Sequence, residues 1–338
     1  MDKIKIAING FGRIGRIFFR QAFGNPKLDF VAINDLGSPE NLAYLLKYDS
    51  VYGPYEKSVE VKNGKLIVDR EREIPVLSEK DPAKLPWKDL GVDVVIESTG
   101  IFESRDKAKA HLDAGAKRVV ITAPAKDDTT PTATPNVGEE FLKSDKITSN
   151  ASCTTNAITP IMAVMMKTPG IKKAVLNTVH GYTATQGLVD GPDRKNDFRR
   201  GRAAAQNIAP SSTGAALAAT KAVPELVGKF DGIALRIPLI CGSIADFTFI
   251  AAKPTSVEEI NDIFKKAAAQ EEWKGILAIT EEPLVSTDIL RNPHGSIVDL
   301  TMTRVLDGDL VKVLAWYDNE WGYGAMLLKH VLAVAQLL

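Results

Sequence analysis

The chain has 338 residues, of which 42 are Lys or Arg and 42 are Asp or Glu, so its formal net charge is zero. This balance argues against a strongly cationic surface that wraps nucleic acid or binds an anionic membrane. Hydrophobic residues make up 45% and charged residues 25%, which is ordinary globular composition and excludes disorder over most of the length. The length predicts about two domains.

Cysteine usage and hydropathy indicate a reduced, cytoplasmic protein. The two cysteines, Cys153 and Cys241, are too few for a disulfide framework and lack the spacing of a zinc site. The N-terminal apolar run is too short for a secretory signal, and no apolar stretch reaches the ~18 residues of a membrane helix. We therefore expect a cytoplasmic location, no membrane partner and no bound metal.

The first 150 residues alternate between short apolar runs and helical patterns. The apolar runs resemble strands buried on both faces and are Lys3–Asn9, Asp29–Asn34, Val92–Ser98 and Arg118–Thr122. The helical patterns are Arg13–Phe23, Pro39–Leu46 and Arg105–Ala114. Ser38 is the expected N-cap of the second helix. This alternation predicts parallel strands joined by right-handed crossovers.

After residue 170 the strand-like runs have fewer helices between them. They are Ala174–Val179, Gly232–Ile237, Ile244–Ala251 and Leu310–Tyr317. Ser256 and Glu259 predict a capping box at the start of an amphipathic helix over Val257–Ala269. Asp307-Gly308 predicts a hairpin turn, and Gly324–Leu338 is again helical.

These patterns predict an α/β protein with two domains. The first has a Rossmann-type parallel sheet and ends near residue 150. The second is α+β, with a mostly antiparallel sheet and helices on one side.

A glycine motif, Gly10-Phe11-Gly12-Arg13-Ile14-Gly15, follows the first predicted strand and opens the first predicted helix. In that context it favours a turn that lets the backbone approach a pyrophosphate at a helix N-terminus. Asp35 ends the second strand, where a carboxylate can bond the adenosine 2′-hydroxyl and repel a 2′-phosphate, which favours NAD over NADP. The alternative is a glycine turn without a dinucleotide.

The two cysteines have different surroundings. Cys153 lies in the polar segment SNASCTTN (149–156) ahead of a helical run, where the helix dipole lowers a thiol pKa and hydroxyl groups can hold an anion. Cys241 lies in an apolar run, as a structural cysteine does. We expect Cys153 to be reactive, with a buried structural role as the alternative.

Among the four histidines, His180 is the best placed to act on a substrate. It ends a predicted strand and opens a polar loop, so it can pair with Cys153 as a base. His111 and His330 lie in helical patterns and are expected on the surface or a helix face, and His294 is expected in a loop.

Two basic features remain open from the residues alone. The run Arg194–Arg202 fits a solvated face, a nucleic-acid patch, phosphate handling or a subunit contact. Arg236, inside an apolar strand, fits either a structural ion pair or an arginine aimed at an anionic substrate.

Taken together, the motifs resemble the phosphorylating glyceraldehyde-3-phosphate dehydrogenases nearly end to end. They are INGFGRIGR (8–16), IND (33–35), KYDS (47–50), ESTG (97–100), SNASCTTN (149–156), HGYTATQ (180–186), VDGP (189–192), RGRAAAQNIAPSSTGAA (200–216) and WYDNEWGYG (316–324). Two segments depart from the family pattern, TATPNVG (132–138) and LICGS (239–243), and Ala157 replaces a cysteine that is often present.

The resemblance implies NAD-dependent oxidation of D-glyceraldehyde 3-phosphate to 1,3-bisphosphoglycerate. Cys153 would form a hemithioacetal and then a thioester that inorganic phosphate cleaves, with His180 as base. The implied cofactor residues are Gly10, Phe11, Gly12, Arg13, Ile14, Gly15, Asp35, Thr99, Gly100, Thr122, Asn319 and Tyr323. The implied phosphate-binding residues are Ser152, Thr154, Thr213 and Gly214 for inorganic phosphate, and Thr183 and Arg236 for the substrate.

The resemblance further implies that residues 1–152 form the NAD-binding domain, completed by a C-terminal helix over 319–338, and that residues 153–318 form the catalytic domain. It also implies a homotetramer in which the segment Tyr182–Arg202 packs against the cofactor of a neighbour. Three alternatives remain. One is an erythrose-4-phosphate dehydrogenase, which has the same Cys and His pair but releases a free acid, and another is a more distant semialdehyde dehydrogenase or acyl-phosphate reductase. The third is a protein that mainly binds RNA or a partner through Arg194–Arg202, although nucleic acid is not the expected primary partner.

Overall fold

The protein is described by a computed structural model that covers residues 3–70, 72–193 and 197–338. The chain divides into two compact units: Met1–Ala133, Glu139–Ala151 and Leu327–Leu338 form the first, and Thr134–Gly138 and Ser152–Met326 form the second. Residues 134–138 and 319–326 therefore group with the second unit, whereas the sequence assigned them to the first domain. The functional boundary at residue 152 stays a prediction.

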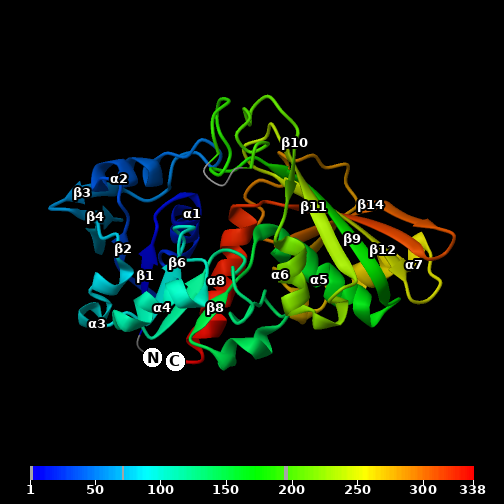
Figure 1. Ribbon diagram of the computed structural model, residues 1–338, viewed down its shortest axis with the longest axis horizontal. Coiled ribbons are helices and arrows are strands. Elements are labelled where there is room, and N and C mark those ends of the chain that lie inside the picture. The colour runs from blue at the N-terminus through cyan, green and yellow to red at the C-terminus, as the bar shows by residue number, and fades with distance from the viewer. Residues whose placement is uncertain (1–2, 71, 194–196) are drawn as a thin grey trace. The chain divides into compact units, whose positions relative to one another are not determined.

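In the described part of the first unit, eight strands form one sheet in the order β3-β4-β5-β2-β1-β6-β7-β8. The strands are β1 Ile4–Asn9, β2 Leu28–Asn34, β3 Val59–Lys62, β4 Lys65–Val68, β5 Arg72–Leu77, β6 Val94–Glu97, β7 Arg118–Ile121 and β8 Ile147–Ser149. The helices are α1 Arg13–Ala22, α2 Pro39–Lys47, α3 Trp87–Leu90 and α4 Arg105–Asp113. The strands from β5 to β8 are parallel, which confirms the predicted Rossmann-type architecture (Figure 1).

The predicted elements of this unit are confirmed with end shifts of one or two residues. Ser38 caps α2 by accepting from the Asn41 backbone N–H at 3.3 Å, with Pro39 at the first helical position. The sequence missed the strands β3, β4, β5 and β8 and the short helix α3, and with them the antiparallel pairing of β3, β4 and β5. Strands of four residues with alternating burial give too short a pattern to separate them from loops.

In the described part of the second unit, seven strands form a mostly antiparallel sheet in the order β10-β11-β9-β12-β15-β14-β13. The strands are β9 Ile171–Gly181, β10 Ala209–Ser212, β11 Phe230–Ile237, β12 Ser243–Ala251, β13 Leu277–Thr280, β14 Ser296–Leu306 and β15 Leu310–Tyr317. The helices are α5 Cys153–Lys167, α6 Ala215–Ala222 and α7 Val257–Ala268. The predicted α+β architecture is confirmed.

One face of this second sheet carries the core of the unit. Helices α5, α6 and α7 pack on it (Figure 1), and the buried cluster includes Ile161, Phe247, Phe264 and Val313. Alternating strand residues such as Val175 and Ile233 point away from this core and are about half exposed, at 54% and 52%. The other face therefore presents apolar side chains that nothing in the described chain of this unit covers.

Two predicted local motifs in this unit have different outcomes. Asp307 and Gly308 both have positive φ, 49° and 74°, and join β14 to β15, which confirms the hairpin. Ser256 caps α7 by accepting from the Glu259 N–H at 3.2 Å, but the Glu259 carboxylate accepts from the Thr255 hydroxyl instead of completing the predicted box. The last helix, α8, spans Trp321–Ala335, which starts one turn before the predicted helical run Gly324–Leu338 and lies within the predicted C-terminal segment 319–338.

Candidate active site

Cys153 is the first residue of α5 and is partly exposed. Ser152 is the N-cap, and its hydroxyl accepts from the Thr155 backbone N–H at 3.0 Å. This cap fixes the start of the helix in extended-to-helical backbone, so the thiol lies where the free N–H groups of the first turn converge. Cys241, by contrast, is buried at 7% exposure and its Sγ donates to Asp318 at 3.2 Å.

His180, at the end of β9, lies next to the cysteine. Its Nε2 is 3.3 Å from Cys153 Sγ, within the range of a hydrogen bond to sulfur. The Tyr317 ring packs edge-on against the imidazole, with ring centroids 6.0 Å apart. The Tyr317 hydroxyl bonds Thr154 at 2.8 Å and Thr178 at 2.7 Å, so one buried tyrosine supports both the helix start and the histidine strand.

Arg236 is brought to His180 by strand register, because the two residues are partners across the parallel pair β11 and β9. His180 Nδ1 has two close neighbours: Arg236 Nη1 at 2.5 Å and the Gly181 carbonyl oxygen at 2.6 Å. These two neighbours are 3.0 Å from each other. A guanidinium only donates and a carbonyl only accepts. The two contacts at Nδ1 therefore demand opposite tautomers of the imidazole and compete with each other.

The pKa values at this pair are shifted by burial and by the arginine. Burial, with the Arg236 charge as the second cause, lowers the pKa of His180 to about 3. Burial also raises the pKa of the Cys153 thiol, although Arg236 and hydrogen bonds at Thr154 oppose the rise. The backbone N–H groups at the helix start lower the thiol pKa as expected, but burial outweighs them, so the net shift of that pKa is upward. Burial therefore disfavours the charged forms of both groups.

The hydroxyl and glycine residues expected to hold phosphate lie at helix starts and strand ends of this unit. Thr213 accepts from the Ala215 N–H at 3.1 Å, and Gly214 is the N-cap of α6 with no side-chain cap, so N–H groups of that helix remain available. Thr183 pairs with Thr185, and its N–H donates to Gln186 at 3.3 Å. The Thr154 hydroxyl, however, is turned into the core toward Tyr317.

The atypical segment at 239–243 orients Asn319. The Asn319 Oδ1 accepts from the Gly242 N–H and the Ser243 hydroxyl, each at 3.0 Å. Its Nδ2 has no hydrogen-bond partner in the part of the chain that the structure describes, so it can donate to a ligand amide. Gly242 has φ +96°, and a Cβ there would lie 2.9 Å from the Ser286 carbonyl oxygen. The sequence placed Asn319 on resemblance alone and missed the residues that orient it.

In the first unit, the glycine loop has the shape of a dinucleotide cradle. A Cβ at Gly10 would lie 2.7 Å from the backbone of Ser98 and Thr99, and one at Gly15 would lie 2.3 Å from the Gly10 carbonyl oxygen. A Cβ at Gly12 would meet nothing within 4 Å. Gly12 also caps α1 without a side-chain hydrogen bond. The loop thus leaves open space over an uncapped helix start, which fits a pyrophosphate.

The other predicted cofactor residues belong partly to the first unit and partly to the second. Asp35 accepts from the Phe11 N–H at 2.7 Å and from the Gly37 N–H at 2.9 Å, which holds its carboxylate at the end of β2. Arg13 pairs with Asp49 at 2.6 Å, beside Ile14 on the first turn. Thr99, Gly100 and Thr122 follow β6 and β7 in the first unit, and Tyr323 lies in the second unit.

Two histidines are placed differently from expectation. His111 and His330 lie in helices as predicted, but they are buried, at 0% and 1% exposure, so the surface prediction is wrong. His294 lies in a loop as expected. Sequence hydropathy treats histidine as polar and gives no signal for a buried partner.

The basic run is only partly described, because residues 194–196 lie outside the described residues. Within the described part, Arg200 pairs with Asp197 at 3.1 Å and Arg202 with Asp190 at 2.9 Å. These arginines are therefore neutralised within the loop. Elsewhere, the described residues hold no cluster of three His, Cys, Asp or Glu that could bind a metal ion. None of the described helices combines the length and apolar character needed to span a membrane.

Comparisons with known proteins agree with this geometry. Residues 4–105 match the family model "Glyceraldehyde 3-phosphate dehydrogenase, NAD binding domain", and residues 152–319 match "Glyceraldehyde 3-phosphate dehydrogenase, C-terminal domain". The chain is 48% identical to glyceraldehyde-3-phosphate dehydrogenase 1 of Trichormus variabilis, over 99% of this chain and 98% of that protein. It is 46% identical to the enzyme of Zymomonas mobilis, over 99% of both chains, and 49% identical to that of Borreliella burgdorferi, over 96% and 98%. The chain belongs to the glyceraldehyde-3-phosphate dehydrogenase family.

Proposed function

We propose that this protein oxidises D-glyceraldehyde 3-phosphate with NAD and inorganic phosphate, giving 1,3-bisphosphoglycerate. The observation that carries the proposal is the contact of 3.3 Å between Cys153 Sγ and His180 Nε2, with Arg236 beside it. A thiol, a base and a cation at one point suit covalent catalysis on an anionic aldehyde. The same reaction runs in either direction, so the proposal covers glycolysis and gluconeogenesis.

In the first step Cys153 Sγ attacks the aldehyde carbon and its proton passes to His180 Nε2. A new S–C bond forms, the C=O π bond breaks, and His180 returns the proton to the former carbonyl oxygen, which becomes the hydroxyl of a hemithioacetal. For this step Nε2 must be the acceptor, which requires the proton on Nδ1, and the Gly181 carbonyl at 2.6 Å stabilises that tautomer. His180 then removes the hydroxyl proton as the carbon is oxidised to a thioester.

The cofactor residues of this chain fit NAD, on the evidence of the open cradle over Gly12 and the fixed carboxylate of Asp35. When bound, NAD supplies a nicotinamide ring that accepts a hydride from the substrate carbon. The glycine loop would hold the pyrophosphate and Asp35 the adenosine ribose. The Asn319 Nδ2 would hold the nicotinamide amide, because Gly242 and Ser243 already bond the Asn319 Oδ1.

In the last step inorganic phosphate attacks the thioester carbon, the S–C bond breaks and the Cys153 thiolate leaves. The N–H groups at the start of α6, beside Thr213 and Gly214, and the Ser152 hydroxyl at the start of α5 would hold the attacking anion. Arg236 and Thr183 would hold the phosphate that the substrate already carries. Prior binding of both anions gives the proximity that lets phosphate compete with water.

A steady-state assay tests this proposal. We expect NADH formation from glyceraldehyde 3-phosphate only when inorganic phosphate or arsenate is present. Turnover without phosphate, with erythrose 4-phosphate as the better substrate and a free acid as product, would instead identify an erythrose-4-phosphate dehydrogenase. The same assay with each cofactor tests Asp35: the ratio kcat/KM should favour NAD, and equal values would disprove that role.

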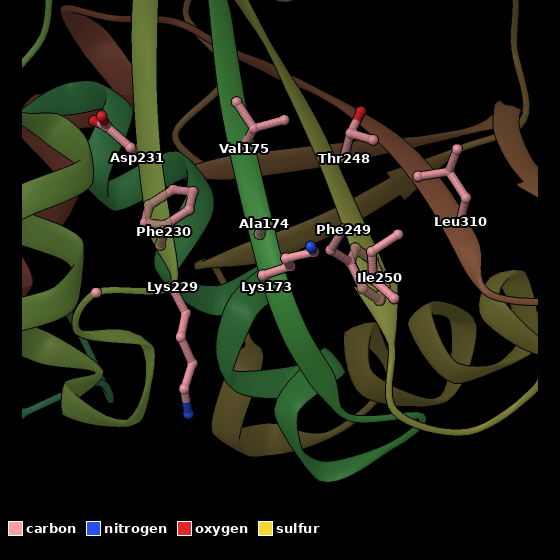
Figure 2. Close-up of a pocket in the computed structure, with 11 residues that line it drawn as sticks. Lys173, Ala174, Val175, Lys229, Phe230, Asp231, Thr248, Phe249, Ile250 and Leu310 are labelled. Atoms are coloured by element: carbon pink, nitrogen blue, oxygen red, sulfur yellow. The ribbon is translucent and has the colours of Figure 1, made fainter.

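We also propose that copies of this chain assemble into a homotetramer in the cytoplasm, where reducing conditions keep the Cys153 thiol free. The support is the open face of the second sheet, where a hollow of about 610 Å³ lies across β9, β11, β12 and β15. Figure 2 shows Val175, Ile250 and Leu310 on neighbouring strands there, with Lys173, Lys229 and Asp231 around them. Opposite charges beside apolar groups suit pairing with a second copy.

The oligomeric state tests this assembly. Ile233→Glu puts a charge on the open face and should lower the mass measured by light scattering from four chains to fewer. Leu217→Glu, on the exposed side of α6, is a matched control and should keep the tetramer. We expect no nucleic acid as primary partner, since Arg200 and Arg202 already pair within their loop; RNA affinity that survives saturation with NAD would contradict this.

A further inference from the structure

A continuous chain of buried polar groups joins the carboxyl ends of four adjacent strands in the first unit. In sheet order it begins at the backbone of Glu79, just after β5. It continues through side chains at the ends of β2, β1 and β6 and then reaches side chains of α4 and α3. These side chains are Asn34, Asn9, Glu97, His111 and Trp87, each at most 4% exposed. We call this set the strand-end chain.

The direction of each hydrogen bond in the strand-end chain is fixed from the β5 side. The Glu79 N–H donates to Asn34 Oδ1 and the Asn34 Nδ2 donates back to the Glu79 carbonyl, both at 2.9 Å. This pair sets the Asn34 amide, which also donates to Asn9 Oδ1 at 2.7 Å. Asn9 must then present its Nδ2, which donates to Glu97 Oε2 at 2.6 Å.

The direction is fixed from the opposite side as well. Trp87 Nε1 lies 3.0 Å from His111 Nδ1, and an indole N–H can only donate. His111 Nδ1 is therefore an acceptor, and the neutral ring carries its proton on Nε2. That proton is donated to Glu97 Oε2 at 3.0 Å. Asn9 Nδ2 and His111 Nε2 lie 3.4 Å apart because both donate to the same oxygen of Glu97, and they are not bonded to each other.

Glu97 is the point where both directions meet. Its second oxygen, Oε1, accepts from the Thr99 backbone N–H at 2.9 Å and from the Thr99 hydroxyl. Four donors thus converge on a carboxylate that is 2% exposed. A buried carboxylate is costly unless its lone pairs are bonded, so the position of each donor is tightly constrained.

The strand-end chain lies at the boundary between β1 and β6, directly beneath the two loops of the candidate cofactor site. In a sheet of this order, ligands bind outside the carboxyl ends of the strands at that boundary. The Ser98 hydroxyl donates to the Gly10 carbonyl at 2.6 Å, and Gly10 packs on the backbone of Ser98 and Thr99. Glu97 therefore sets the position of the segment 98–100 against the glycine loop.

We propose that Glu97, held by His111 in a single tautomer, is a positioning residue for the dinucleotide. This inference rests on the proposed function, in that it takes NAD as the ligand of the first unit. It adds that affinity for NAD depends on the Glu97 carboxylate, which does not face the ligand, and on the Trp87 indole N–H, which lies further from the ligand. Glu97→Gln replaces one acceptor oxygen by an N–H₂ group, which opposes the donors of either Asn9 and His111 or Thr99 and displaces the loop.

The test uses the full-length protein and measures NAD binding by calorimetry without substrate. Glu97→Gln should weaken NAD binding by about tenfold to a hundredfold, the scale for a hydrogen bond to a charged group. Trp87→Phe removes one N–H and frees the His111 tautomer, and it should weaken NAD binding less. Glu103→Gln, at a partly exposed carboxylate on the same loop paired with Lys126, is the matched control and should bind NAD normally.

Two further readouts separate positioning from mere loss of structure. KM for NAD should rise in Glu97→Gln while KM for glyceraldehyde 3-phosphate and kcat at saturating NAD hold. Nitrogen-15 NMR should show His111 protonated only on Nε2 in the wild type, and a mixture of tautomers in Trp87→Phe. If Glu97→Gln does not fold, Trp87→Phe decides the question alone.

The outcomes distinguish this inference from the proposed function. NAD affinity unchanged in a folded Glu97→Gln or Trp87→Phe, or a His111 ring protonated on Nδ1 in the wild type, overturns the inference. Equal rises in KM for NAD and for the aldehyde also overturn it, because they indicate general loss of structure. A wild-type protein that binds NAD but does not turn over glyceraldehyde 3-phosphate refutes the function and leaves the positioning role intact.

Discussion

His180 in the second unit and His111 in the first are both buried imidazoles with separate partners at their two ring nitrogens. At His111 the Nδ1 partner is an indole that only donates, so one tautomer is possible. At His180 a carbonyl and a guanidinium compete for Nδ1, so the proton can reside on either nitrogen. A fixed tautomer suits a positioning role, whereas an exchangeable one suits proton transfer.

The largest expected effect is that of replacing Cys153, whose Sγ faces His180. Cys153→Ser should lower kcat by about 10⁴-fold or more, because a serine hydroxyl is far less acidic and less nucleophilic than a thiol. NAD affinity should stay within about twofold, since the glycine loop lies in the other unit. The matched control is Cys241→Ser, in which a hydroxyl can still donate to Asp318, and it should retain turnover. Equal losses in both variants would remove Cys153 from its assigned role.

The comparison itself is tested by the same substitution at both histidines. His180→Gln should lower kcat by about 10²- to 10⁴-fold, the usual contribution of a general base, and leave NAD binding intact. His111→Gln keeps a donor near the Nε2 position, so it should lose NAD affinity only modestly and keep kcat. The measurements are kcat at saturating substrates and calorimetric NAD affinity. A loss of kcat in His111→Gln as large as in His180→Gln would break the distinction.

A third buried histidine, His330, sharpens the comparison because its expected role is purely structural. Its Nε2 contacts the Thr148 hydroxyl at 3.0 Å, and burial lowers its pKa from 6.5 to about 4. The unfolded chain binds the proton more readily, so stability rises with pH between about 4 and 6.5 and is lost as pH falls through that window. The loss at pH 4 amounts to about 3 kcal/mol from this residue.

Acid unfolding with urea at several pH values measures this contribution. His330→Gln removes the titrating ring, so the slope of unfolding free energy against pH should be shallower than in the wild type. His294→Gln, at a partly exposed loop histidine, is the matched control and should leave the slope unchanged. An unaltered slope in His330→Gln would show that His330 does not titrate in this window, or titrates equally in both states.

Much of this arrangement could be predicted from the sequence, and the remainder has a common physical cause. Motifs with local signals, such as the Gly10 loop, the Ser38 cap and the Asp307-Gly308 turn, have their expected geometry because neighbouring residues determine it. The strand-end chain and the Tyr317 contacts were missed, because they join residues separated by tens to hundreds of positions. Hydropathy also misplaced His111, since burial of a polar ring depends on partners elsewhere in the chain.

The smallest expected effect, in the substitution of Arg236, bears most directly on why the two histidines differ. Arg236→Lys keeps the positive charge but loses the planar fork, so KM for glyceraldehyde 3-phosphate should rise by about tenfold. Arg236→Leu removes the charge that helps lower the pKa of His180, so that pKa should rise, although burial, the larger cause, still holds it below 6.5.

Titration of His180 by NMR in both variants separates the two contributions of Arg236. An upward shift of the midpoint is expected in Arg236→Leu and not in Arg236→Lys, because only the former removes the charge. Loss of the competing donor should also place the proton on Nδ1, bonded to the Gly181 carbonyl, in Arg236→Leu. If His180 keeps its midpoint and tautomer without the guanidinium, the carbonyl alone governs the ring, and His180 is as fixed as His111.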